Sequence, residues 1–104
     1  MDIEQASNFI ASLSVEVQKF EDSLSDIYES KIVATFCGVF CLNCTGISLR
    51  HGGLIRFEGF DSSGNPAIIL CSIEQVNLAI LAQPRQLNSP KRKIGFSVDL
   101  PNTE

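Results

Sequence analysis

The sequence predicts an α+β domain in which a long N-terminal amphipathic helix packs on an antiparallel β-sheet. The apolar residues before position 28 follow a helical period, and the composition beyond residue 30 is typical of strands separated by glycine-rich turns. The chain has 104 residues, 44% of them apolar, which is enough to bury roughly two-thirds of the unfolded surface in one core. We therefore expect a single domain over residues 1–104, with a sheet and a short helix or strand at 31–82 and an extended, proline-containing arm at 83–104.

The helix is predicted over residues 3–28. Apolar residues recur there at alternating steps of three and four, and neither Gly nor Pro interrupts the segment. At 1.5 Å per residue such a helix would be about 39 Å long, more than a domain of this size needs to cover its own sheet. Either the apolar stripe packs only on that sheet, or part of it pairs with a second copy of the chain. The stripe consists of Ile3, Ala6, Ile10, Leu13, Val17, Phe20, Leu24 and Ile27.

The strands are predicted from runs of β-branched and aromatic residues. Gly38, Gly46 and residues 51–53 separate the first runs, and the segment 60–66 combines Asp, Ser, Gly, Asn and Pro into a strong turn signal. The apolar run after that turn is expected to return as the second arm of a hairpin. The predicted strands cover residues 31–37, 39–49, 54–60 and 67–71.

Residues 72–82 are compatible with two structures. Ser72 and Gln75 are spaced as a capping box, and a helix beginning there would place Ile73, Val76 and Ile80 on one face. The apolar run at 78–82 is equally compatible with a buried strand. We favour the helix.

The charges are distributed unevenly. The chain carries 8 basic and 12 acidic residues, a net charge of −4, but seven of the acids precede residue 31, so the remainder is slightly basic. Such a balance disfavours attachment to nucleic acid polymers or to a membrane surface. Neither an apolar span nor an export signal is present, and we expect a cytoplasmic protein. One basic group, containing Arg85, Lys91, Arg92 and Lys93, is either a site for a phosphate-bearing partner or a solvated stretch.

No motif assigns an enzymatic reaction. Cys37, Cys41 and Cys44 have the C-x3-C-x2-C spacing of radical S-adenosylmethionine enzymes, but 104 residues cannot build the barrel of those proteins. Four thiols including Cys71 could also hold zinc or support redox chemistry, although cysteines inside apolar runs are typically small buried hydrophobes. His51 is the only histidine and is expected in a loop, and no phosphate-binding glycine motif occurs. We expect neither a cofactor nor catalysis.

Three stretches resemble a family of small phage and prophage proteins whose domain has no assigned function. They are FEGFDSSGNP at 57–66, IEQVNL at 73–78 and PKRKIGF at 90–96, with looser similarity at 24–26 and 34–36. That family is similar to the Thoeris anti-defence sponges, which bind cyclic ADP-ribose signals of an infected bacterium without cleaving them. The pair Cys71 and Ser72 departs from the more polar pair expected in relatives.

The resemblance implies a homodimer, or a higher assembly of dimers, that sequesters a cyclic nucleotide in the host cytoplasm. The basic group would contact phosphate, Phe57 or Phe60 would stack on a base, and Asn77 and Gln75 would read its edge. The alternative is an interaction module that uses its long helix and basic arm to inhibit a host protein. The phosphate contacts expected are Arg85, Lys91, Arg92 and Lys93.

Overall fold

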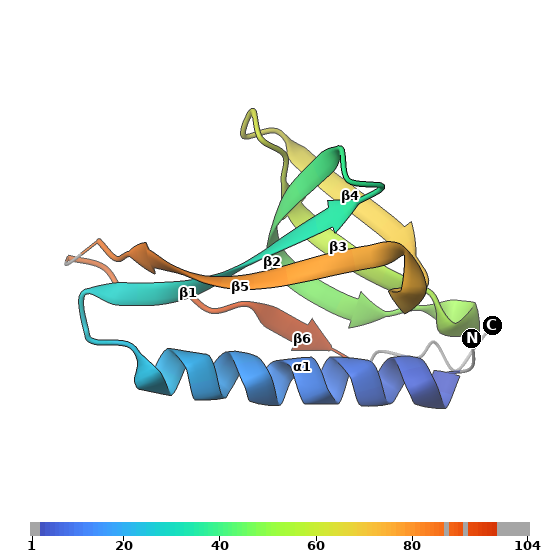
Figure 1. The fold of residues 1–104 in the computed structure, drawn as a ribbon, viewed down its shortest axis with the longest axis horizontal. Helices are drawn as coiled ribbons and strands as arrows, with labels where there is room; N and C mark the ends of the chain where they lie inside the picture. The colour runs from blue at the N-terminus through green and yellow to red at the C-terminus, as the bar shows by residue number, and fades with distance from the viewer. Residues whose placement is uncertain (1–2, 87, 91, 98–104) are drawn as a thin grey trace.

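The computed structural model describes residues 3–86, 88–90 and 92–97, and it contains one long helix against a six-stranded sheet (Figure 1). The main path of the sheet is β4-β3-β2-β1-β5, with antiparallel neighbours throughout, and β6 pairs with β2 beside it. The predicted fold class is therefore confirmed. The elements are α1 (Ile3–Ser23), β1 (Tyr28–Phe36), β2 (Phe40–Leu49), the 3-10 turn η1 (His51–Gly53), β3 (Ile55–Phe60), β4 (Pro66–Cys71), the 3-10 turn η2 (Ile73–Gln75), β5 (Val76–Pro84) and β6 (Gly95–Ser97).

Helix α1 is shorter than the periodicity indicated. It ends at Ser23, whose hydroxyl donates to the carbonyl of Phe20 at 2.6 Å, and the chain turns through residues 24–27 into β1. The prediction of a helix to residue 28 is thus wrong. From Tyr28 onward the chain is extended and pairs with β5, so the end of the predicted helical segment belongs to β1. Ile27 is consequently 54% exposed.

The apolar stripe of α1 packs on the chain's own sheet. Ala6, Ile10, Leu13 and Val17 are buried in the same core as residues of all four strands β1 to β4. With 21 residues the helix is about 32 Å long. The helix is therefore shorter than the predicted length of about 39 Å, and its central apolar residues pack within the chain.

The region 72–82 is a strand rather than the favoured helix. The predicted capping interaction exists, because the backbone N–H of Ser72 donates to Oε1 of Gln75 at 3.0 Å, but it closes only the single turn η2. The chain then continues as β5, which pairs with β1 over nine residues. Val76, Leu78 and Ile80 are half-buried in alternation, which is the period of a strand.

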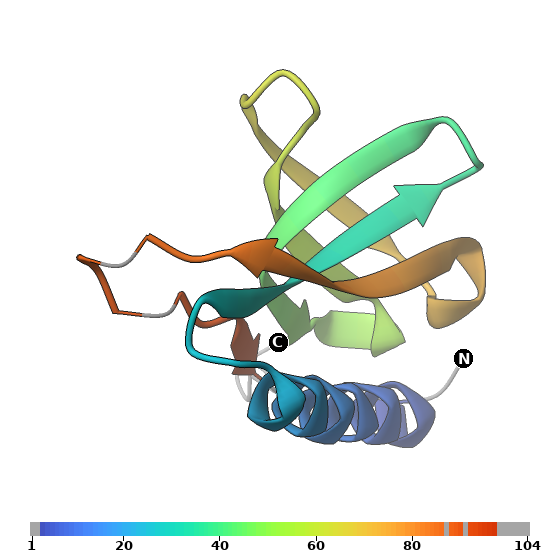
Figure 2. The same ribbon diagram turned by 60° about the vertical axis from the view of Figure 1, so that its left-hand side comes forward.

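The sheet divides beside β2, because β1 pairs with one half of this strand and β6 with the other; we call this division the fork. Strand β1 pairs with the first half of β2, where Ile32 lies opposite Cys44, and then diverges with β5 as a two-stranded arm (Figures 1 and 2). Beyond that point β6 takes the place of β1, pairing in parallel with residues 46–48 of β2. The predicted arm at 83–104 is thus partly regular: β5 continues to Pro84, and residues 95–97 form a strand, while 98–104 lie outside the described residues.

The predicted hairpin between β3 and β4 is confirmed. In its turn, Oδ1 of Asp61 accepts the backbone N–H groups of Ser63 and Asn65, each at 2.9 Å, and Gly64 has a φ of 83°. Gly59, near the turn, faces a bulge of β2, and a Cβ at this position would overlap the carbonyl oxygen of Asn43.

The four cysteines fall into two classes. Cys44 and Cys71 are buried in the core, as expected for small hydrophobic side chains. Cys37 and Cys41 are exposed, which corrects the expectation for these two, because the β1–β2 hairpin projects its turn into solvent. Cys37 occupies that turn with a φ of 55°.

Candidate functional site

Arg85 has a structural role in this conformation. Its backbone N–H donates to the carbonyl of Ile27 at 2.9 Å, and its Nη1 donates to the carbonyl of Asp26 at 3.1 Å. Its Nε donates to the carbonyl of Ser89 at 3.3 Å. The guanidinium therefore ties the loop after α1 to the loop after β5, and part of its donor capacity is used within the chain.

Arg92 is anchored to the buried carboxylate of Glu29. The side chain of Glu29 is 5% exposed, and its Oε1 accepts the backbone N–H of Arg92 at 3.1 Å. The other oxygen, Oε2, accepts Nε2 of Gln83 at 2.9 Å and lies 3.9 Å from Nε of Arg92. A buried carboxylate is costly unless charge and hydrogen bonds compensate it, and these groups do so. The rest of the Arg92 side chain is exposed.

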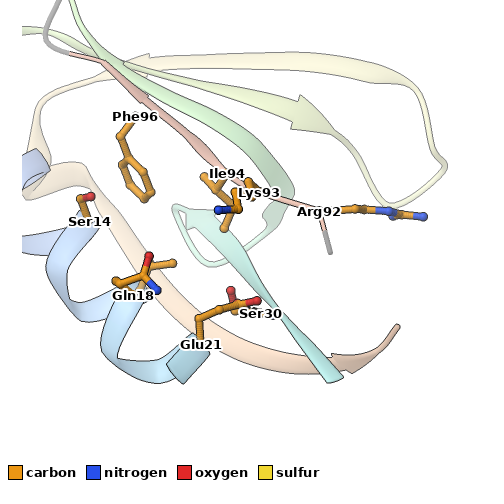
Figure 3. Close-up of a pocket in the computed structure, with 9 residues that line it drawn as sticks. Ser14, Gln18, Glu21, Ser30, Arg92, Lys93, Ile94 and Phe96 are labelled. Atoms are coloured by element: carbon orange, nitrogen blue, oxygen red, sulfur yellow. Dashed lines mark hydrogen bonds between the residues drawn. The ribbon is translucent and has the colours of Figure 1, made fainter. Parts of the chain in front are cut away.

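Two hollows flank the segment 92–94, which runs through the fork. The first, of about 290 Å³, lies between this segment and α1. Figure 3 shows Lys93, Ile94 and Phe96 on one side of it, facing side chains of the helix, whereas the side chain of Arg92 extends away. We call it the helix-side hollow; the helix contributes Ser14, Val17, Gln18 and Glu21 to it.

The second, the strand-side hollow, has a similar volume of about 290 Å³. It is lined by Arg92, Lys93 and Phe60, three predicted ligand contacts that come from two separate segments of the chain. Phe60 is 44% exposed, so part of its ring surface is accessible. This hollow is the candidate site. Its further lining residues include Lys31, Asn43, Cys44, Thr45 and Gln83.

Besides Arg85, three of the predicted contact residues in the described part of the chain do not line this hollow. Phe57 is fully buried in the core and offers no ring surface to a ligand, so its proposed stacking role is corrected. Asn77 lies opposite Thr35 at the start of β5, and Gln75 precedes it in η2. The same strand ends at Pro84, opposite Tyr28, and at the rise of an extended strand this end is about 24 Å from Asn77. The hollow lies near the Pro84 end, where Gln83 lines it. Lys91 lies outside the described residues.

Lys31, Asn43 and Thr45 line the strand-side hollow but were not predicted from the sequence as site residues. Lys31 lies in β1 next to the buried Ile32, and Asn43 and Thr45 lie in β2, where the bulge before Gly46 interrupts the pairing with β3. The sequence contained one indication of them, because Asn43 and Thr45 are polar residues at alternate positions of an otherwise apolar strand. Only the fork, which depends on long-range pairing, reveals that they line one hollow.

The lining of the strand-side hollow is cationic and polar, with one aromatic ring. Burial raises the pKa of the Cys44 thiol to about 12, so this group stays protonated at neutral pH, and it contacts the carbonyl of Leu42 at 3.8 Å. Lys31 and Lys93 have no acidic partner among the described residues. Within the same part of the chain, no three His, Cys, Asp or Glu side chains are grouped so that they could hold a metal ion. The hollow therefore presents positive charge, amide and hydroxyl groups, and one aromatic ring.

The fold and the hollow define a small α+β protein with a cationic cleft at a sheet fork. The chain belongs to the family described as "Family of unknown function (DUF6173)", whose model matches residues 3–97. No curated protein and no solved structure matches it. None of the helices in the described part of the chain has the length and apolar composition to cross a membrane.

Proposed function

We propose that this protein is a non-catalytic, phage-type sponge that sequesters a cyclic nucleotide immune signal in the cytoplasm of an infected bacterium. The signal would be a cyclic ADP-ribose isomer or a cyclic oligonucleotide, and its capture would block anti-phage signalling. The observation that carries the proposal is the strand-side hollow, where Arg92, Lys93 and Lys31 meet the accessible ring of Phe60. Charge and an aromatic surface together are what a phosphate-bearing nucleotide requires.

Each group would have a distinct part in binding. The cationic side chains would contact the phosphates, and a charge-assisted hydrogen bond of this kind contributes about 1.5–3 kcal/mol. Phe60 would stack on a base. Asn43 and Thr45 would take the polar contacts that the sequence analysis expected of Asn77 and Gln75, because Asn77 lies at the far end of β5 and Gln75 in the turn η2 before it.

The lining supports capture rather than cleavage. Its thiol, Cys44, is held protonated by burial, and the described residues that line it include no histidine to act as a general base. A volume of about 290 Å³ is at the lower limit of ligand pockets, which span roughly 300–1,000 Å³. A cyclic dinucleotide would therefore extend out of the hollow, and a homodimer or an assembly of dimers would help to enclose it.

Calorimetry with the full chain tests the proposal. The panel contains cyclic ADP-ribose isomers, cyclic dinucleotides and cyclic trinucleotides, with inorganic phosphate as a control for simple anion binding. We expect at least one cyclic nucleotide to bind at micromolar or lower concentration and to be recovered intact after the protein is denatured. Binding of all members only at millimolar concentration, or recovery of a cleaved product, would contradict the proposal.

The alternative proposal, an interaction module that inhibits a host protein, has less support. Its main argument was the long helix, and the central residues of the apolar stripe, Ala6, Ile10, Leu13 and Val17, are buried on the chain's own sheet. A stable complex with one protein from a bacterial lysate, together with no binding to the nucleotide panel, would favour it.

A further inference from the structure

Strand β4 forms one edge of the sheet. Within the described residues it pairs only with β3, so its second row of backbone N–H and C=O groups faces outward. Exposed edges are usually protected from pairing with other chains by charged side chains or proline. Pro66 begins β4, but residues 67–71 contain neither proline nor a charged residue. This edge is therefore open to pairing with another strand.

The outer face next to this edge is apolar. Ile68 and Leu70 are 52% and 58% exposed, whereas Ile69 and Cys71 point into the core on the opposite face. Two large apolar side chains on a single edge strand give a partner both a hydrogen-bonding edge and a surface on which to pack.

The charges beside this face are already balanced. The only charged residues of β3 are Arg56, which lies opposite Leu70, and Glu58, which lies opposite Ile68. They form an ion pair with 2.9 Å between Nη1 and Oε1. Two copies of the surface can consequently meet without an unpaired like charge facing its equivalent, an arrangement that would be destabilising.

We propose that β4 pairs antiparallel with β4 of a second copy, so that the two sheets join across a two-fold axis. A strand that pairs antiparallel with an identical strand generates such an axis, and an isologous contact of this kind uses the same self-complementary surface on both copies. The inference is independent of the ligand proposed above. It also differs from pairing through α1, because the central residues of the α1 stripe are buried on the chain's own sheet.

The other sheet edge, β5, fits this role less well. Its residues on the face shared with Leu81 are Asn77, Ala79 and Gln83, which are polar or small, and Gln83 is engaged with Glu29. Leu81, an exposed apolar residue of β5, therefore supplies a matched control.

Sedimentation equilibrium of the full chain tests the pairing. We expect a dimer whose dissociation constant rises at least about tenfold with Leu70→Lys, because the substitution places a charge in the apolar contact. Leu81→Lys, on the other edge, is expected to leave the constant unchanged. Hydrogen exchange supplies a second readout: the amides of residues 67–71 should become more protected as protein concentration rises.

Three outcomes would overturn the proposal. They are a wild-type chain that stays monomeric at about millimolar concentration, a dimer that Leu70→Lys leaves intact, and a dimer that Leu81→Lys weakens equally. Circular dichroism checks that each variant is folded. If Leu70→Lys fails to fold, Ile68→Asn replaces it, with the same expected loss of dimer.

Discussion

Glu29 and Arg92 are joined by two contacts, although 63 positions separate them in the sequence. One carboxylate oxygen accepts the backbone N–H of Arg92 at 3.1 Å, and the other lies 3.9 Å from its Nε. The contacts fix the segment that separates the two hollows and leads into β6. The carboxylate is thus a positioning group for the candidate site.

Replacement of this carboxylate should loosen the segment. Glu29→Ala removes the acceptor of Gln83 and Arg92, and leaving donors without partners costs about 2–3 kcal/mol in the free energy of unfolding. Denaturant unfolding measures the loss. Glu74→Ala, at an exposed position, should change the stability by less than about 0.5 kcal/mol. An equal effect of the two substitutions would show that the buried contact has no special importance.

Gly59 should tolerate no side chain. Gly59→Ala places a Cβ on the carbonyl oxygen of Asn43, so the bulge must shift, and we expect a loss of about 3 kcal/mol on thermal or denaturant unfolding. At Gly95 a Cβ would lie 3.8 Å from the nearest neighbouring atom, the carbonyl oxygen of Thr45. Gly95→Ala is therefore the control, and similar stability of the two variants would refute the close approach at Gly59.

Cys44 should make the protein less stable at alkaline pH. Its pKa is raised from 9.0 to about 12 by burial, so the folded state retains a proton that the unfolded chain releases. The stabilisation is complete below pH 9 and declines between pH 9 and about 12, with a limiting slope of about 1.4 kcal/mol per pH unit. Urea unfolding at pH 8, 9 and 10 measures the slope. Cys44→Ala should flatten it relative to Cys41→Ala, which removes an exposed thiol; identical slopes would contradict the prediction.

Phe57 and Phe60 should separate stability from binding. Phe57 is fully buried and Phe57→Ala should cost about 3–5 kcal/mol of stability. Phe60 is 44% exposed, so Phe60→Ala should remain folded while it weakens nucleotide binding by about 1–3 kcal/mol. Unfolding and calorimetry on both variants check the pair. Unchanged affinity in folded Phe60→Ala would exclude the stacking role.

Local patterns predicted those parts of the fold that local interactions determine. The stripe through Ala6, Ile10 and Leu13 and the Asp61 turn depend on neighbours in the sequence, and both are present. The helix end and β5 were misread because pairing between β1 and β5 outweighs the local helical pattern. For the site, the basic residues were found as a group, but Lys31 was missed because only the fork brings it to residues 92–94.

We propose that a cyclic nucleotide binds in the strand-side hollow, and a calorimetric comparison of three chains tests this proposal. The dissociation constant of the tightest cyclic ADP-ribose isomer or cyclic oligonucleotide is measured for the wild-type chain, Lys93→Glu and Lys19→Glu. Lys93 lines the hollow, whereas Lys19 is an exposed residue of α1. We expect at least about tenfold weaker binding for Lys93→Glu and no change for Lys19→Glu. Equal affinity of the two variants, or no ligand bound below millimolar concentration, would contradict it.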